Sequence, residues 1–396
     1  MTPETAQQFR ALEHQAHDLM NFFCEVGYEA VAPSVIQPAD IFLDVVGEDL
    51  RRRTYVFSDT DGAELCLRPD LTVPTCRLHW QRCTQNGSST LARYCYNGPA
   101  FRFQPADAST AHPREFRQLG IELFGDKNKE RADIEVLHLI VEALRRAGLR
   151  QFRIRIGDLG IFQDLLSVLD LPARWRDRLR ASLWRPDTFR DELRRLATQP
   201  DASIEGLPEA LVVALRGCDA KAAERVVTRY FDENDIELIG TRTLREIVDA
   251  LMSAIADAEA DALPAETVRL IELYFDVKAP ARAAGARLAD LMQENGVDIA
   301  PALALYQKRL KLLTELDIDV ATVEFSAEFG RTIQYYTGFV FEVLAEPLGE
   351  RSPVAGGGRY DNLMRMVGAK VEVPAVGAMI HTERLLSVVG DGGRRD

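Results

Sequence analysis

A long helical block separates two groups of strand-like segments, and this order limits the fold more than any other feature of the sequence. Over residues 160–316, apolar residues recur at helical spacing in a background rich in Ala, Leu, Arg and Glu. Apolar and polar residues alternate as in strands on both sides of the block, at 91–125, 152–158, 320–326 and 338–344. We therefore expect an α+β fold in which 1–158 and 318–396 build one domain and 159–317 is a helical insertion.

Two further segments carry helical patterns outside this block. Residues 5–27 place apolar side chains at helical spacing and end at Gly27, a residue type common just after a helix. Residues 130–147 do the same, with two arginines near the end and Gly148 after it. The last segment begins at Val376 as a strand of small residues and turns into a helix. We expect these helices to belong to the same domain as the strands.

Charge and cysteine spacing narrow the classes of function. The formal net charge is −13 and no basic stripe stands out, so we expect no nucleic-acid partner. The six cysteines show no CxxC pair and no regular spacing, which argues against a zinc site and a disulfide framework and favours reduced thiols. No window approaches the roughly 18 apolar residues of a membrane span, and the N-terminus lacks a targeting signal. We expect a cytoplasmic protein without a membrane partner, a metal or a cofactor.

Polar side chains on half-buried strands indicate a candidate binding site. Gln118 and Glu122 lie on one strand face with Gly120 between them, and a glycine there leaves space for a ligand; alternatively, this face simply meets water. Other motifs add Asp70 and Thr72 in "LRPDLT", on one face if extended, Arg102 in "GPAFRF", and Arg331, Tyr335 and Tyr336 in "GRTIQYYTG". Acids suit an ammonium group, arginine a carboxylate, and glutamate with tyrosine a polar ring, so the set fits a small zwitterion. Periodicity alone does not name that ligand.

The order of these motifs resembles one family. The chain carries, in this order, "GYEAVAPSVIQPADIF", "LRPDLTVP", "GPAFRFQ", "REFRQLGIELFG", "GRTIQYYTGFVFE", "GGGRYDNLM" and "PAVGAMIHTERLL". This series looks like the catalytic domain of class II histidyl-tRNA synthetases and, more closely, like their paralogue, the regulatory subunit of ATP phosphoribosyltransferase. The resemblance covers roughly residues 5–158 and 320–389. It implies a class II aminoacyl-tRNA synthetase-like antiparallel sheet flanked by helices, with a helical insertion.

Carried over residue by residue, the resemblance implies a histidine-binding site. The residues implied are Asp70, Thr72, Arg102, Gln118, Glu122, Arg331, Tyr335 and Tyr336. Their implied partners are the α-ammonium group for Asp70, Thr72 and Gln118, the imidazole for Glu122 and Tyr336, and the carboxylate for Arg331. Arg102 matches the arginine that neutralises the α-phosphate of ATP in the synthetases.

The sequence departs from the synthetases where they hold ATP. Gln104 stands where their pattern has a glutamate near the adenine, and His112 replaces a phosphate-binding arginine. His381 replaces a glycine beside the adenine, and such overpacking typically costs ~1–3 kcal/mol. The sequence ends 12 residues after Arg384, too few for the anticodon-binding domain that synthetases carry there. We therefore expect no catalytic residue.

Three hypotheses stay open at this point. The first is a non-catalytic regulatory subunit that binds histidine and docks the short-form catalytic subunit of ATP phosphoribosyltransferase, which carries out the first step of histidine biosynthesis under histidine feedback. As the resemblance implies, it would form a homodimer, through the N-terminal helix and the "GYEAVAPSV" strand, within a hetero-oligomer. The second is a truncated histidyl-tRNA synthetase-like ligase that forms histidyl-adenylate. The third is a structural paralogue whose pocket is vestigial.

Overall fold

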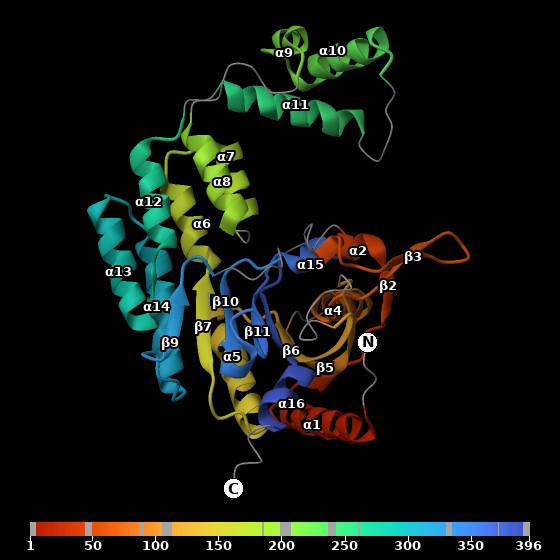
Figure 1. Ribbon diagram of the computed structural model, residues 1–396, viewed down its shortest axis with the longest axis vertical. Coiled ribbons are helices and arrows are strands. Elements are labelled where there is room, and N and C mark those ends of the chain that lie inside the picture. The colour runs from red at the N-terminus through yellow and green to blue at the C-terminus, as the bar shows by residue number, and fades with distance from the viewer. Residues whose placement is uncertain are drawn as a thin grey trace. The chain divides into compact units, whose positions relative to one another are not determined.

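The computed structural model divides the chain into two compact units (Figure 1). Unit 1 comprises Met1–Asp170, Leu183–Arg185 and Glu272–Asp396, and unit 2 comprises Leu171–Ser182 and Pro186–Ile271. The residues that the structure describes are 5–43, 50–86, 91–104, 113–183, 186–198, 207–236, 243–259, 262–329, 335–370 and 372–390.

Unit 1 is built on a large mixed sheet. Across the described residues the sheet has nine strands, in the order β1-β5-β6-β12-β11-β10-β7-β9-β8. Their bounds are Glu29–Ala30 (β1), Ala92–Phe101 (β5), Glu115–Phe124 (β6), Ala375–His381 (β12), Ala355–Arg359 (β11), Phe339–Leu344 (β10), Arg153–Asp158 (β7), Val323–Ser326 (β9) and Lys278–Pro280 (β8). Neighbours pair antiparallel except β1 with β5 and β7 with β9, which are parallel. The predicted α+β fold, with strands from both ends of the chain in one sheet, is confirmed.

Unit 1 also contains most of the helices outside the sequence of unit 2. They are α1 (Ala6–Glu25), α2 (Ala39–Leu43), α4 (Thr72–Asn86), α5 (Lys129–Arg146), α6 (Leu159–Val168), α13 (Ala281–Glu294), α14 (Ala300–Glu315), α15 (Leu363–Met366) and α16 (Thr382–Gly390), with one 3-10 turn at Glu346–Leu348. Helix α1 begins in a capping box, because Thr5 and Gln8 each accept a hydrogen bond from the other's backbone N–H. Helices α1 and α16 lie side by side and contact β6 (Figure 1). The helices predicted at 5–27 and 130–147 are confirmed.

A second, smaller sheet lies before α4 in the sequence. It has the order β2-β4-β3, with bounds Ile36–Pro38 (β2), Glu64–Leu67 (β4) and Val56–Ser58 (β3). Strand β4 pairs antiparallel with both neighbours. It leads through the turn at Arg68–Leu71 into α4, so this sheet delivers the start of α4 to the site described below.

Unit 2 is helical and has a core of its own. Its helices are α7 (Ala173–Ser182), α8 (Pro186–Ala197), α9 (Glu209–Leu215), α10 (Ala220–Glu233) and α11 (Leu244–Ala258), and α12 (Ala265–Phe275) runs on into unit 1. Leu215, Val227 and Val248 are buried in one apolar cluster of α9, α10 and α11. No helix in the described part of the chain is long and apolar enough to cross a membrane.

The predicted insertion and unit 2 have different bounds. Three helices within the predicted insertion 159–317, namely α6, α13 and α14, belong to unit 1. The division of the chain into one domain of 1–158 and 318–396 and an inserted domain of 159–317 stays a prediction. This stretch is also not wholly helical, because β8 pairs with β9 at the sheet edge. Strand β8 has only three residues, too few to show the alternation of a strand. Its structure depends on its partner β9, which lies far away in sequence.

Strand β6 is buried on both faces. Leu119 and Ile121 point to one side and Gln118 and Glu122 to the other, and each of them is at most 1% exposed. The expected polar face therefore meets the protein interior rather than water. Phe103 lies outside β5, which ends at Phe101, and its side chain is exposed.

Candidate functional site

A small cavity in unit 1 brings together six of the eight predicted site residues. Its lining comprises Asp70, Thr72, Arg102, Gln118, Tyr335, Tyr336, Gly356, Ala378 and Met379. These residues come from the start of α4, the end of β5, from β6, β11 and β12, and from the segment before β10. The cavity volume is about 10 Å³, room for about one water molecule. Arg331, like His112, lies outside the described residues, and the roles of all eight residues in binding remain predictions.

The segment that carries Asp70 and Thr72 is not extended. Thr72 is the first residue of α4, and Asp70 precedes the helix, where its Oδ1 accepts a hydrogen bond of 3.1 Å from the N–H of Val73. The condition under which the two side chains would share one strand face is therefore not met, because an aspartate two residues before a helix satisfies its free N–H groups. The turn nevertheless brings both side chains to the cavity.

Asp70 carries a buried oxygen that needs a donor. Its side chain is 3% exposed, and Oδ2 has no hydrogen-bond partner in the described structure. Burial raises the pKa of this carboxyl, while the positive charge of Arg102 lowers it. A buried carboxylate oxygen without a donor is costly, so a cationic donor entering the cavity would be stabilised here.

Gln118 is fixed by the start of the same helix. Its Oε1 accepts a hydrogen bond of 3.1 Å from the N–H of Leu71, and the side chain is 1% exposed. A carbonyl oxygen has two lone pairs, so Oε1 can accept a second bond from a ligand ammonium group. The position of Gln118 thus depends on the turn that also carries Asp70.

Glu122 lies deeper than the cavity and is bonded to two phenols. The hydroxyl of Tyr96 donates to Oε1 at 2.9 Å, and the hydroxyl of Tyr360 donates to Oε2. Burial raises the pKa of Glu122 to about 7, and hydrogen bonds from Tyr360, Thr72 and Tyr96 oppose this rise. Both tyrosines were missed from the sequence, although Tyr360 is the last residue of the "GGGRY" motif. The implied neighbour Tyr336 lines the cavity instead.

Glycines make room for this buried cluster rather than for a ligand. A Cβ on Gly120 would lie 2.7 Å from the hydroxyl of Tyr96 and 2.5 Å from the carbonyl oxygen of Ala378. A Cβ on Gly377, which pairs with Glu122 across β12 and β6, would lie 1.5 Å from Oε2 of Glu122. The expectation that Gly120 leaves space for a ligand was therefore wrong, because the chain's own phenol fills that space.

His381 and Arg102 both lie against Phe116. The His381 ring centroid is 5.5 Å from that of Phe116, and the Arg102 guanidinium lies 5.1 Å over the same ring. Arg102 Nε also donates to the carbonyl oxygen of Pro69 at 2.8 Å. His381 is buried and is the last residue of β12, opposite Gln118 in the register. The Phe116 ring, which could stack on a flat base, is therefore already in contact with His381 and Arg102.

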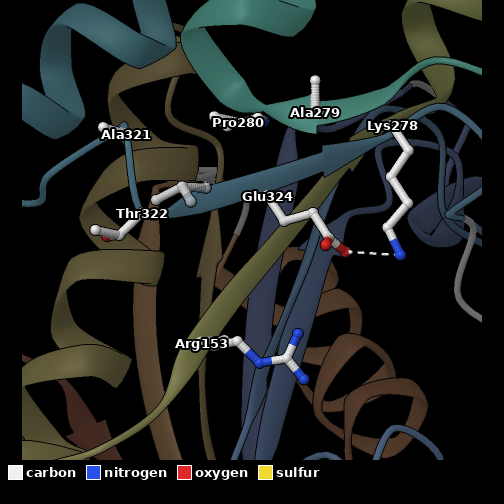
Figure 2. A pocket seen from close by; sticks show the side chains of 8 residues that line it. Arg153, Lys278, Ala279, Pro280, Ala321, Thr322 and Glu324 are labelled. Carbon is white, nitrogen blue, oxygen red and sulfur yellow. Dashed lines mark ion pairs between the residues drawn. The ribbon is translucent and has the colours of Figure 1, made fainter.

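A larger cavity lies elsewhere in unit 1 and collects none of the predicted residues. Figure 2 shows its lining on β7, β8, β9 and the two residues before β9, and its volume is about 480 Å³. Lys278 forms an ion pair of 3.5 Å with Glu324, and Arg153 pairs with Glu350. Because the cations of its lining already have acidic partners, this cavity offers no charge that distinguishes one ligand class from another.

Comparisons with known proteins identify the family. The family model described as histidyl-tRNA synthetase matches residues 2–251 and 222–385. An ATP phosphoribosyltransferase regulatory subunit from Agrobacterium fabrum is 34% identical over 388 residues, covering 95% of this chain and 96% of that protein. One from Allorhizobium ampelinum is 32% identical over 369 residues, covering 93% and 95%. The chain belongs to the ATP phosphoribosyltransferase regulatory subunit family.

The fold agrees with this membership. A crystal structure described as an ATP phosphoribosyltransferase regulatory subunit/histidyl-tRNA synthetase from Bacillus halodurans aligns with a TM-score of 0.65 at 22% identity. The alignment covers 98% of this chain and 82% of that chain. This chain thus has a histidyl-tRNA synthetase-like fold, and the resemblance drawn from the sequence motifs is confirmed.

Proposed function

We propose that this regulatory subunit binds free histidine in the Asp70 cavity and conveys feedback inhibition to a separate short-form catalytic subunit of ATP phosphoribosyltransferase. The observation that carries the proposal is that Asp70, which lines a cavity together with Gln118, has a buried Oδ2 without a hydrogen-bond partner among the described residues. An amino acid's ammonium group supplies the missing donor and the matching charge.

The remaining groups suit the other parts of histidine. Glu122 is a buried acceptor for an imidazole N–H, and Tyr336 adds a phenol at the cavity wall. Arg331 is the proposed partner of the carboxylate on the grounds of the sequence motif. A pocket with both an acid for the ammonium group and an acid for the ring favours histidine over neutral amino acids, because a neutral side chain leaves Glu122 without a donor from the ligand.

We also propose that this chain does not form histidyl-adenylate. Activation of an amino acid requires ATP beside it with the α-phosphorus in line with the carboxylate. The contacts of Phe116 with Arg102 and His381 support the absence of a purine seat, since a base stacking on this ring would have to displace both side chains. The phosphoribosyl transfer itself is assigned to the partner subunit.

Feedback then works through assembly. Histidine stabilises whichever assembled state binds it more tightly, so inhibition requires that the pocket differ between active and inhibited states. We propose a homodimer through α1 and β1 within the hetero-oligomer; the position of β1 at the edge of the sheet supports this. The six cysteines, all free thiols, support a cytoplasmic location.

The test compares Asp70→Asn with wild type. A hydrogen bond to a charged group contributes about 1.5–3 kcal/mol, so the variant should bind histidine about 10- to 150-fold more weakly in isothermal calorimetry. In the complex reconstituted with a short-form catalytic subunit, histidine inhibition should shift to higher concentration by a similar factor. Asp61→Asn, at an exposed carboxylate outside the cavity, is the matched control and should change neither value.

Three results contradict the proposal, each in a different way. Histidine-dependent exchange of pyrophosphate into ATP by the isolated chain would favour the ligase. The absence of calorimetric binding to wild type would remove the histidine site. Unchanged inhibition in Asp70→Asn would place the inhibitory site elsewhere and favour a vestigial pocket.

A further inference from the structure

The imidazole acceptor of the proposed site is closed off by the chain's own phenols. Glu122 is fully buried, and each of its oxygens accepts a hydrogen bond from a tyrosine hydroxyl. Glu122 is not among the described residues that line the cavity, whose volume of about 10 Å³ is far below that of an amino acid. A ligand ring can therefore reach Glu122 only if the cavity wall moves and one of the phenols that lie against Glu122 makes room for it.

Tyr96 and Tyr360 are both fully buried, but they differ in their backbone setting. Tyr96 lies in the middle of β5, a ten-residue strand, opposite Gly120 of β6, and its ring fills the space that this glycine leaves. Tyr360 follows the last residue of β11, and its backbone N–H donates to the carbonyl oxygen of Ala375 at 2.8 Å. A residue at a strand end can change direction without breaking a ladder of hydrogen bonds on both sides.

Tyr360 also stands next to the wall that has to move. Its ring centroid is 5.6 Å from that of Tyr335 and 6.5 Å from that of Tyr336, and both of these residues line the cavity. The rings of Tyr335 and Tyr336 contact each other at 4.8 Å. A ligand that pushes these two rings apart would therefore press on Tyr360 first.

The residues on either side of Tyr360 are anchored in a buried ionic network. Arg359 Nε donates to Asp133 Oδ1 at 2.8 Å, and Arg359 Nη1 donates to Asp361 Oδ1 at 2.8 Å. The other oxygen of Asp133 accepts from Arg309 of α14 at 2.8 Å, which links α5, α14 and the end of β11. Movement of Tyr360 therefore acts directly on the segment that holds α5 and α14 together.

We propose that Tyr360 is a latch: its hydroxyl occupies the Glu122 oxygen that the ligand's imidazole N–H takes, and its release couples occupancy of the pocket to α5 and α14. This inference rests on the proposed function, because it specifies how histidine enters that site. It assigns Tyr360 a role opposite to that of Tyr96. Tyr96 stays in place and positions Glu122, whereas Tyr360 competes with the ligand.

The two roles predict opposite signs for two matched substitutions. Tyr360→Phe removes the competing bond and should bind histidine about tenfold more tightly than wild type in calorimetry, the scale of one hydrogen bond to a charged group. Tyr96→Phe removes the group that positions Glu122 and should bind histidine more weakly. In the reconstituted complex, Tyr360→Phe should be inhibited at a lower histidine concentration than wild type.

Hydrogen exchange on the wild-type chain keeps the proposal testable if a variant does not fold. Saturating histidine should change amide exchange in peptides covering β11, Tyr360 and α15, and in α5. Equal or weaker binding by Tyr360→Phe overturns the latch, as does unchanged exchange in these peptides. Either result leaves the proposed function intact as long as wild type binds histidine, whereas a wild type that binds none refutes both.

Discussion

Gly377 offers a direct test of the buried cluster, because it lies under the Glu122 carboxylate. In Gly377→Ala, the new Cβ would lie 1.5 Å from Oε2 and 2.4 Å from Cδ of Glu122. The backbone of β12 cannot retreat, since Gly377 pairs with Glu122 in β6 on one side and with Gly358 in β11 on the other. The carboxylate must therefore leave its position between the phenols of Tyr96 and Tyr360.

The magnitude follows from the bonds that Glu122 loses. Each hydrogen bond to a charged group contributes about 1.5–3 kcal/mol, so loss of the two phenol bonds should lower the free energy of unfolding by at least about 3 kcal/mol. In a Glu122→Ala background the obstructing side chain is gone, and Gly377→Ala should cost at least about 2 kcal/mol less. Gly390→Ala is the control, because its Cβ would meet no atom within 4 Å. It should stay within about 0.5 kcal/mol of wild type.

The assay is urea unfolding, with hydrogen exchange followed in peptides from β6 and β12. Because the chain has two compact units, these peptides report the stability of unit 1 separately from that of unit 2. A Gly377→Ala protein within about 0.5 kcal/mol of wild type would refute the reasoning. So would a cost that is the same with and without the Glu122 side chain, since the effect would then not act through the carboxylate.

Two further predictions concern buried charges. The pKa of Glu122 is raised from 4.5 to about 7, so the stability that this carboxyl contributes is complete below about pH 4.5 and is lost as the pH rises through 7. The unfolding free energy of wild type minus that of Glu122→Gln should thus fall by about 3 kcal/mol between pH 4.5 and 8; a flat difference contradicts the raised pKa. Arg309→Met leaves the buried carboxylates of Asp133 and Asp158 without a shared cation and should lower the unfolding free energy by about 3–5 kcal/mol. Arg194→Met, at an exposed ion pair, should cost less than about 1 kcal/mol, and equal costs would show that burial of the pair is unimportant.

The sequence predicted the parts of the fold whose signals are local. Helix α5 combines apolar spacing with two arginines in its last turn, and β7 alternates over six residues, so both were found close to their observed bounds. Strand β8 was missed because its three residues become a strand only through pairing with β9. Strand β11 consists largely of glycine, and its strand character comes from neighbours on both sides rather than from alternation.

The candidate site was predictable from motifs but not from periodicity. Asp70 and Gln118 are far apart in sequence, so no periodicity shows that they line one cavity; the chemistry of the set and the family resemblance indicated a shared site. Strand alternation correctly placed Glu122 on the same face as Gln118. It could not reveal the partners of Glu122, because Tyr360 reaches it across two strand boundaries, from β11 past β12 to β6.

The error about Gly120 has a general physical cause. Protein interiors are packed nearly as densely as crystals, so a glycine on a buried strand face shows that something lies close to the backbone but not what it is. Here the nearby groups are the Tyr96 phenol at Gly120 and the Glu122 carboxylate at Gly377. The hydroxyls of Tyr96 and Tyr360 each donate to one oxygen of Glu122. In the proposed site, the affinity for a ligand ring therefore depends on how strongly these two phenols hold the carboxylate. Under the proposed function, residues such as Tyr360, which need not touch the ligand in the bound state, would therefore set the histidine concentration at which this subunit responds.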